Sequence, residues 1–183
     1  MLKHCTIDNL GKSHLDFWWK LKNDNHLQRY YWGNPWEVFP KRALELEIEK
    51  DLKSKDIRRV SQYVVKDASG GYAGFIVQRR NLWSDAPLPG YVFVSVIPED
   101  DTKLAEPAIN EAFRWLLDMC FVNYKADVAC AEPIEDNAAY IAFLERHGFQ
   151  RQGLLRNCFM DKGVFLGRVM MDLLQGEWQA KKE

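Results

Sequence analysis

The stretch from Val128 to Phe149 constrains the fold of this chain more than any other stretch. Its first four residues, 128–131, are small and apolar, and they predict a short buried strand that ends at Glu132–Pro133. Asp136–Asn137 then supplies a helix start, and the apolar spacing that follows predicts a helix that stops at Gly148. Open α/β sheets hold their ligands outside the carboxyl ends of strands. We therefore expect a ligand site where this strand gives way to this helix.

The other elements follow from hydrophobic periodicity and from turn residues. The clearest amphipathic helix pattern covers 109–121, within an expected helix that runs from 102–105 to about residue 122, with Pro107 in its first turn. A strand–helix–strand unit over 91–131 predicts two parallel neighbouring strands, with 91–97 central in the sheet. The remaining expectations are strands over 2–7, 57–66, 72–80, 149–158 and 164–174, helices that begin at Ser13 and Pro40, a helix end and turn over 23–26, a loop over 30–36, and a polar tail over 175–183.

This order of elements predicts a mixed-sheet α/β (α+β) fold. The chain of 183 residues is long enough to bury a core, and it contains no internal repeat and no linker that would divide it. We therefore expect a single domain over residues 1–183.

Composition narrows the classes of function. A net charge of −1 gives no strong electrostatic attraction to nucleic acid or to a membrane surface. The sequence has no apolar run of membrane-spanning length and no signal-peptide pattern, so we expect a cytoplasmic protein without nucleic-acid or membrane partners. The four cysteines, at 5, 120, 130 and 158, lack metal-ligand spacing, so we expect no metal and buried, reduced thiols.

Four segments in this order resemble the GNAT superfamily of N-acetyltransferases, with the RimJ/RimL-like branch as the best match. They are V-F-V-S-V-I-P (92–98), I-N-E-A-F-R-W-L-L-D-M-C-F (109–121), D-N-A-A-Y-I-A-F-L-E-R-H-G-F (136–149) and the closing hairpin within 153–178. The resemblance implies a mostly antiparallel sheet of six to seven strands with a splayed central parallel pair and about four helices. It also implies acetyl transfer from acetyl-CoA directly to a primary amine, either a protein N-terminus or a small-molecule amine.

The resemblance places the pantetheine arm of acetyl-CoA beside the backbone of Ser95 and Val96. It also makes Asn137 a hydrogen-bonding partner of that arm. The alternative for Asn137 is a first-turn helix residue beside an Asp136 cap.

The segment 102–107 departs from the family's phosphate-binding loop, whose pattern is Arg/Gln-x-x-Gly-x-Gly/Ala. Here the loop would consist of Thr102, Lys103, Leu104 and Ala105, followed by Glu106 and by Pro107, which has no N–H to donate. Neighbouring carboxylates oppose phosphate, and Lys103 alone counters them. Two interpretations stay open: the loop binds CoA with fewer backbone donors, or CoA binding is weakened or lost and the fold serves as a binding or assembly module.

Acetyl transfer needs a neutral amine and a protonated leaving thiol, so a general base and a general acid help. Glu132, at the end of its strand, is the candidate base, and Tyr140 is the candidate acid. The alternatives are a solvated strand-end carboxylate and a phenol that only packs in the helix. Leu144 stands where many other members of the superfamily carry a tyrosine. At the far end of the helix, we interpret His147 as favouring the helix dipole.

The aromatic segments 30–36 and 81–91 have two interpretations. They fold over the core, or they form a wall of the acceptor cleft with Tyr31, Trp32 and Trp83 as substrate-binding residues. The second interpretation also leaves room for an acyl group longer than acetyl. The sequence is compatible with a monomer or with a homodimer that pairs through the last hairpin.

Overall fold

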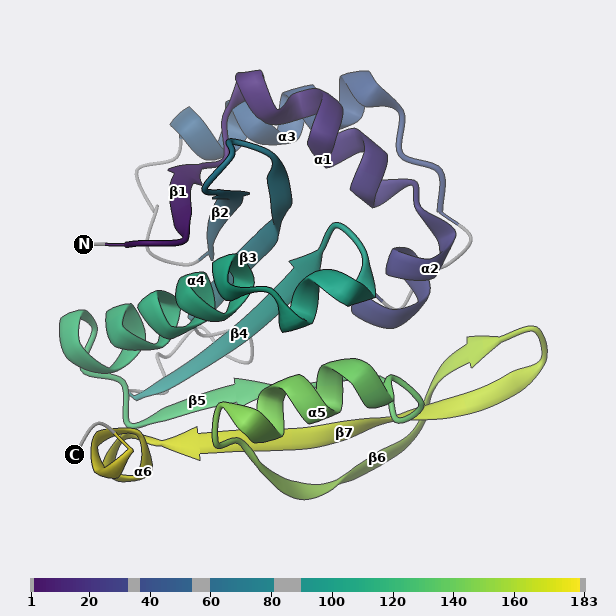
Figure 1. Cartoon of the computed structure of the whole chain (residues 1–183). Helices are drawn as coiled ribbons and strands as arrows, with labels where there is room; N and C mark the ends of the chain where they lie inside the picture. Colours follow the sequence, from purple (N-terminus) through teal and green to yellow (C-terminus); the bar gives the residue numbers. More distant parts are fainter. Residues whose placement is uncertain (1, 33–36, 54–59, 81–89, 182–183) are drawn as a thin grey trace.

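The computed structural model describes residues 2–32, 37–53, 60–80 and 90–181 (Figure 1). Its strands are β1 (Cys5–Asn9), β2 (Val60–Asp67), β3 (Tyr72–Arg80), β4 (Tyr91–Pro98), β5 (Val128–Ala131), β6 (Gln150–Asp161) and β7 (Val164–Leu174). Its helices are α1 (Leu15–Lys22), α2 (Asn25–Leu27), α3 (Lys41–Lys53), α4 (Pro107–Asp118), α5 (Ala138–Arg146) and α6 (Gln175–Ala180). Short helical turns occur at η1 (Lys12–His14), η2 (Gln28–Trp32), η3 (Asp101–Ala105) and η4 (Met119–Asn123).

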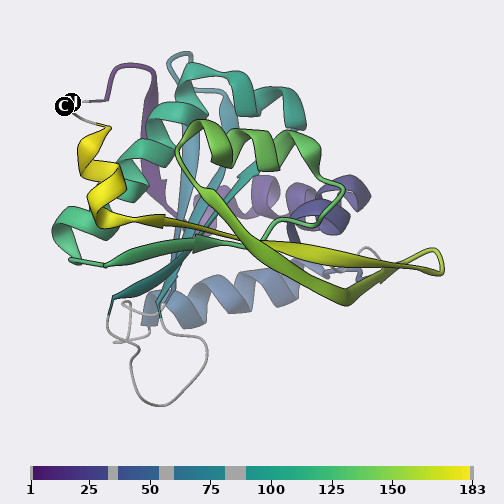
Figure 2. The ribbon, with the colours of Figure 1, turned by 90° about the horizontal axis from the view of Figure 1, so that it is seen from below.

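The strands form one seven-stranded sheet in the order β1-β2-β3-β4-β5-β7-β6. Only β4 and β5 pair in parallel, and the other neighbours are antiparallel. Figure 2 shows α4 and α5 on one face of the sheet and α3 on the other. The predicted fold class is confirmed, with β4 as the central strand of the sheet.

Two clusters of buried side chains follow from this layering. Val94 and Val96 of β4 face α4 and α5, whereas Val77 of β3 and Ile97 of β4 face α1 and α3. Successive side chains of a strand point to opposite faces, so a strand buried on both faces has a nearly continuous apolar sequence, as in 92–97, where only Ser95 is polar. Apolar surface buried in this way stabilises the fold by roughly 25 cal/mol per Å².

The parallel pair β4–β5 is short. Its register runs over Tyr91↔Val128, Val92↔Ala129 and Phe93↔Cys130, and then the pairing stops while β4 continues to Pro98. On its other side β5 stays paired with β7 through Ala131↔Met171. The two central strands therefore part at their carboxyl ends, which confirms the splayed pair that the resemblance implies.

The start of α5 differs from the expectation. Asn137, not Asp136, is the N-cap, because the Asn137 side chain accepts a hydrogen bond from the backbone N–H of Tyr140. The Asp136 carboxylate instead lies 2.8 Å from Arg29 Nη2. At the far end, Gly148 adopts φ +99° and the Phe149 N–H donates to the Leu144 carbonyl, so the helix ends where the sequence predicts.

Three other expectations are corrected. Residues 30–32 of the expected loop belong to the helical segment η2. The predicted helix end at residue 23 is confirmed, and the short helix α2 follows it because the Asp24 carboxylate caps α2. The expected polar tail carries α6, since Trp178 is buried against the core. The Cys158 thiol is exposed, because the apolar residues around it lie on the projecting β6–β7 hairpin (Figure 1).

His147 is buried, not a charged residue at the helix end. Its ring packs against Phe113 and Phe143, with centroid distances of 4.9 and 4.4 Å, and Nδ1 lies 2.9 Å from the Phe143 carbonyl oxygen. Burial lowers the pKa of His147 to about 4. The imidazole is neutral at pH 7, with Nδ1–H donating to Phe143, so the expected stabilisation of the helix dipole by a charged histidine is wrong.

This neutral histidine predicts a pH-dependent stability. The unfolded chain binds a proton at His147 below about pH 6.5, whereas the folded chain does so only near pH 4. Stability is therefore present above pH 6.5 and is lost as the pH falls toward 4, by about 2 kcal/mol between pH 7.5 and pH 5. Urea unfolding at both pH values measures it.

His147→Phe is the matched control for this prediction. It removes the titrating group and keeps a ring between Phe113 and Phe143. The difference in unfolding free energy between the two pH values should shrink by about 2 kcal/mol in this variant. An unchanged difference would show that other groups cause the loss.

Candidate functional site at the parting of β4 and β5

A cavity of about 160 Å³ lies where β4 and β5 part. Four of the residues expected at a site line it: Tyr31, Ser95, Glu132 and Tyr140. The sequence analysis missed the other lining residues, Tyr30, Arg79, Phe93, Val94, Pro133 and Arg168. Arg79 and Arg168 belong to β3 and β7, and their sequence patterns alone show no signal that they meet.

The cavity reaches through the sheet. Ser95 pairs with Val77 and Phe93 with Arg79, so these side chains share the face that Val77 turns toward α1 and α3. Tyr140 comes from α5, on the opposite face. The parting of the strands lets groups from both faces meet in one space.

Tyr140 fills part of the gap beside β4. The Val96 backbone N–H donates to the Tyr140 hydroxyl oxygen at 3.0 Å, and the Tyr140 ring lies 5.2 Å from the Tyr31 ring. Burial raises the pKa of Tyr140 to about 12, while hydrogen bonds from the Val96 backbone and the Ser95 side chain lower it. The phenol keeps its proton at neutral pH, and that proton can be donated because the oxygen accepts from Val96.

Glu132 stands at the mouth of the same cavity. Its side chain is 22% exposed, and Oε2 lies 3.8 Å from Nη1 of Arg168. That separation is an ion pair without a hydrogen bond. Glu132 is therefore a carboxylate with oxygens available to a ligand amine.

Asn137 has a buried side-chain donor that a bound ligand could satisfy. The residue is 4% exposed, and its Oδ1 accepts from Tyr140 N–H at 3.1 Å. Its Nδ2 has no partner at hydrogen-bonding geometry among the described residues. The Asn137 amide is near enough to the Tyr31 hydroxyl to offset a small part of the rise in pKa that burial causes there. A buried donor without a partner costs free energy, and an acceptor atom of a bound ligand would satisfy it.

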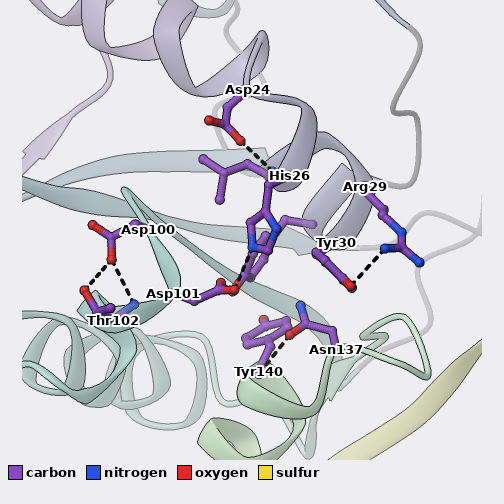
Figure 3. A network of polar contacts seen from close by, with 11 residues as sticks. Asp24, His26, Arg29, Tyr30, Asp100, Asp101, Thr102, Asn137 and Tyr140 are labelled. Carbon is purple, nitrogen blue, oxygen red and sulfur yellow. Dashed lines mark hydrogen bonds and ion pairs between the residues drawn. The ribbon is translucent and has the colours of Figure 1, made fainter.

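A polar network holds η2 over this site (Figure 3). Asp101 of η3 accepts a hydrogen bond from the Tyr31 hydroxyl at 2.8 Å and lies 2.6 Å from His26 Nε2. Burial and the Asp101 charge raise the pKa of Tyr31. Arg29 Nη1 donates to the Tyr30 hydroxyl at 3.0 Å. These contacts fix both tyrosines at the cavity wall.

Arg29 also ties η2 to two distant elements. Besides its contact with Asp136, its Nε lies 2.9 Å from Oδ2 of Asp161, at an angle that makes an ion pair and not a directed hydrogen bond. The Asp161 side chain is 8% exposed. A buried carboxylate of this kind needs its cation.

The loop expected to hold phosphate is closed by its own hydrogen bonds. Thr102 N–H donates to the Asp100 carboxylate at 2.9 Å, Lys103 N–H donates to the Asp100 carbonyl at 3.0 Å, and Glu106 N–H donates to the Lys103 carbonyl at 3.0 Å. Lys103 Nζ lies 3.0 Å from the Glu106 carboxylate. The Leu104 side chain is buried in the core. The pair Asp100–Thr102 is a helix N-cap pattern that the sequence could have shown.

A second cavity, of about 750 Å³, lies beside this loop. Ala105 and Pro107 line it together with Lys3, His4, Asn110, Glu111, Arg114 and Arg146. Arg146 Nη2 donates to the Leu104 carbonyl at 3.3 Å, and the Glu111 carboxylate accepts from the backbone N–H groups of Lys3 and His4. Besides Lys103, the cationic side chains near the loop thus include Arg114 and Arg146, which the sequence alone did not single out.

Two of the expected substrate-binding residues cannot be placed. Trp83 lies outside the described residues, and of Trp32 only the backbone, at the end of η2, is described.

Comparison with solved structures reveals the same fold in acetyltransferases. The spermidine N-acetyltransferase from Vibrio cholerae, in complex with CoA and spermine, superposes with a TM-score of 0.80 at 19% identity, over 96% of this chain and 98% of that chain. The spermidine/spermine N-acetyltransferase from the same organism, with manganese ions, gives 0.75 at 19% identity, over 98% of both chains. A third acetyltransferase structure gives 0.73 at 21% identity, over 98% of this chain and 88% of that chain.

No protein-family model matches the sequence, and no curated protein matches it significantly. At identities near one in five, the structural likeness defines the fold, which this chain shares with these acetyltransferase structures. Within the described ranges, no helix is both long and apolar enough to cross a membrane.

The ion pairs of Arg29 predict a stability effect. Arg29→Met leaves the Asp161 carboxylate buried without its cation, so the free energy of unfolding should fall by about 2–4 kcal/mol. Adding Asp161→Asn should restore part of this loss, since the uncompensated charge is gone. Chemical denaturation of the parent protein, the two single variants and the double variant measures the coupling.

Arg42→Met is the control for this cycle. Arg42 pairs with Glu45 on the exposed surface of α3, where solvent screens the charges, so loss of this pair should leave stability nearly unchanged. Additive effects of the Arg29 and Asp161 changes would contradict the coupling.

Proposed function

We propose that this protein is an N-acetyltransferase that moves an acetyl group from acetyl-CoA directly to a primary amine. The observation that carries the proposal is the parting of β4 and β5, with Glu132, Ser95 and Tyr140 gathered in the gap. The fold shared with acetyltransferases supports it, since one of those structures contains CoA. Fold alone does not determine function, so the chemistry of these groups must carry the argument.

Glu132 and Tyr140 have complementary roles in this proposal. Glu132 takes the proton that the attacking amine loses, and Tyr140 gives its proton to the departing thiolate of CoA. The buried phenol, whose pKa is about 12, is protonated at every pH at which an amine is neutral enough to attack, up to about pH 10. The Val96 N–H, which donates to the Tyr140 hydroxyl in this structure, is a backbone donor that we assign to the acetyl carbonyl oxygen when acetyl-CoA is bound.

Asn137 fits the pantetheine arm of acetyl-CoA, because its unpartnered Nδ2 can donate to an amide carbonyl of that arm. Ser95 and Val96 offer the edge of β4 on the opposite side of the gap. The co-substrate supplies the acetyl thioester.

The segment Thr102, Lys103, Leu104 and Ala105 fits the pyrophosphate less well, because amides of this loop are engaged within it. We propose that the phosphates are held near Lys103 and Ala105 mainly by cationic side chains, with Arg114 and Arg146 in the adjoining cavity.

The closed loop favours a second candidate function, a binding or assembly module that has lost its use of CoA. In that case Glu132 is a solvated carboxylate and Tyr140 a packing residue. Binding of acetyl-CoA separates the two functions.

Acetyl-CoA binding is the first test. At a concentration 100 times its dissociation constant, acetyl-CoA should stabilise the protein by about 2.7 kcal/mol, which thermal denaturation detects as a rise in Tm. Asn137→Ser keeps a capping oxygen and removes Nδ2, so it should weaken acetyl-CoA about tenfold.

Asn123→Ser, at an exposed position in η4, is the control and should bind acetyl-CoA like the parent protein. No binding by calorimetry at millimolar acetyl-CoA would sink the acetyltransferase proposal and favour the assembly module.

The proposed proton transfers predict a second effect. Glu132→Gln and Tyr140→Phe should each lower kcat with the best amine by about 10²–10⁴-fold, with the KM for acetyl-CoA little changed.

Glu145→Gln and Tyr91→Phe, both at exposed positions away from the cavity, are the controls and should keep full activity. Parent-like kcat in Glu132→Gln or Tyr140→Phe would overturn the role assigned to that residue.

A further inference from the structure

The charges of the cavity between β4 and β5 constrain the acceptor. Two guanidinium groups, Arg79 and Arg168, line the cavity against one carboxylate, Glu132. Among the described lining residues the cavity is therefore net positive. A site for a polycationic amine needs the opposite balance, because like charges in a partly buried space repel strongly.

Neither guanidinium is fully used by the protein. Arg168 Nη1 is 3.8 Å from Glu132 Oε2, too far for a hydrogen bond, and its side chain is 30% exposed. Arg79 lies opposite Phe93 in the β3–β4 register and makes no ion pair with any residue that the structure describes. Burial and the Arg168 charge lower the pKa of Arg79, as expected of a cation that lacks a full counter-charge.

The size and the walls of the cavity suit a small molecule. Its volume of about 160 Å³ is below the range of roughly 300–1,000 Å³ that is usual for drug-sized ligands. Tyr30, Tyr31 and Phe93 give it aromatic walls. The arrangement offers a proton acceptor at Glu132, two cationic donors nearby, and apolar surface between them.

We propose that the acceptor is a small amine that also carries a carboxylate, that is, a free amino acid or a close analogue. Arg79 and Arg168 bind its carboxylate, and its amine lies toward Glu132 and Tyr140. Guanidinium groups suit this role because they present paired N–H donors that match the two carboxylate oxygens. This inference rests on the proposed function, since it names the acceptor class of the same site.

The chemistry of the step balances. The neutral amine attacks the thioester carbonyl, a C–N bond forms and the C–S bond breaks. Glu132 removes the amine proton and Tyr140 protonates the thiolate, so the products are an N-acetyl amino acid and CoA. The carboxylate stays on Arg79 and Arg168 throughout and takes no part in bond changes.

A matched panel of acceptors tests the inference. The twenty amino acids are compared with their amides, which keep the amine and lose the carboxylate, and with spermidine and spermine. CoA release is measured at fixed acetyl-CoA. The best amino acid should exceed its own amide in kcat/KM by about tenfold to a hundredfold, as expected for a charge-assisted contact. An amide or a polyamine that equals or exceeds it would overturn the proposal.

Variants of Arg79 and Arg168 test whether these two side chains cause the preference for the amino acid over its amide. Arg79→Gln and Arg168→Gln should each reduce the preference for the acid over the amide by about tenfold, chiefly through KM. Arg151→Gln, at an exposed position on β6, is the control and should leave the preference unchanged. Where a glutamine variant fails to fold by circular dichroism, the lysine variant at that position replaces it and should retain part of the preference.

Calorimetry with the same amino acids separates failure of this inference from failure of the proposed function. If acetyl-CoA binds but no amine is acetylated, amino acids should still bind more tightly than their amides, with a dependence on Arg79 and Arg168. Equal binding of acid and amide, or no binding of either, would overturn the amino-acid proposal even if another amine is acetylated.

Discussion

The early end of the β4–β5 pairing is the constraint on which the functional geometry depends. The two strands share only the register from Tyr91↔Val128 to Phe93↔Cys130, and beyond it the β4 edge has no neighbouring strand. Unpaired backbone groups inside a sheet must find other partners. One of them, the Val96 N–H, finds the Tyr140 hydroxyl, which brings α5 into the gap and joins the two faces of the sheet. The cavity and its titratable groups follow from this parting.

A second set of contacts holds η2 over this gap, and its tyrosines form part of the cavity wall. η2 lies over the gap because Tyr31 contacts Asp101, as does His26 of α2 (Figure 3). Arg29 adds contacts with Asp136 and with the buried Asp161. These interactions connect the first part of the chain to η3, α5 and β6. The wall of the cavity between β4 and β5 therefore depends on the loop after β4, and Asp101 connects the proposed acceptor region to the proposed co-substrate region.

The two cavities described above differ from the loop between β4 and α4 in the sign of their charged side chains. The loop is rich in carboxylates and uses its amides internally, whereas each cavity carries arginines: Arg79 and Arg168 in one, Arg114 and Arg146 in the other. The anion sites proposed above thus use side chains more than backbone amides. Guanidinium groups give directional contacts to carboxylate and phosphate, but they require long side chains to converge from distant elements.

The sequence by itself determined most of the strands, the helix α4 and the strand-to-helix transition at 128–149, but not α2, η2 or α6. Local sequence patterns are enough to predict these elements, because each pattern spans only a few residues. Examples are the apolar alternation of strands, Pro107 at a first helical turn and Gly148 at a helix end. The tertiary structure decided which groups share a cavity. Arg79 and Arg168 meet Glu132 only because β3 and β7 flank the parting pair, and Asn137 becomes a buried donor only when α5 docks on the sheet. His147 likewise loses its charge through burial against Phe113, which no pattern around residue 147 reports. Such contacts depend on chain segments that are far apart in sequence, and their energies come from burial and charge in the folded state, so sequence spacing carries no record of them.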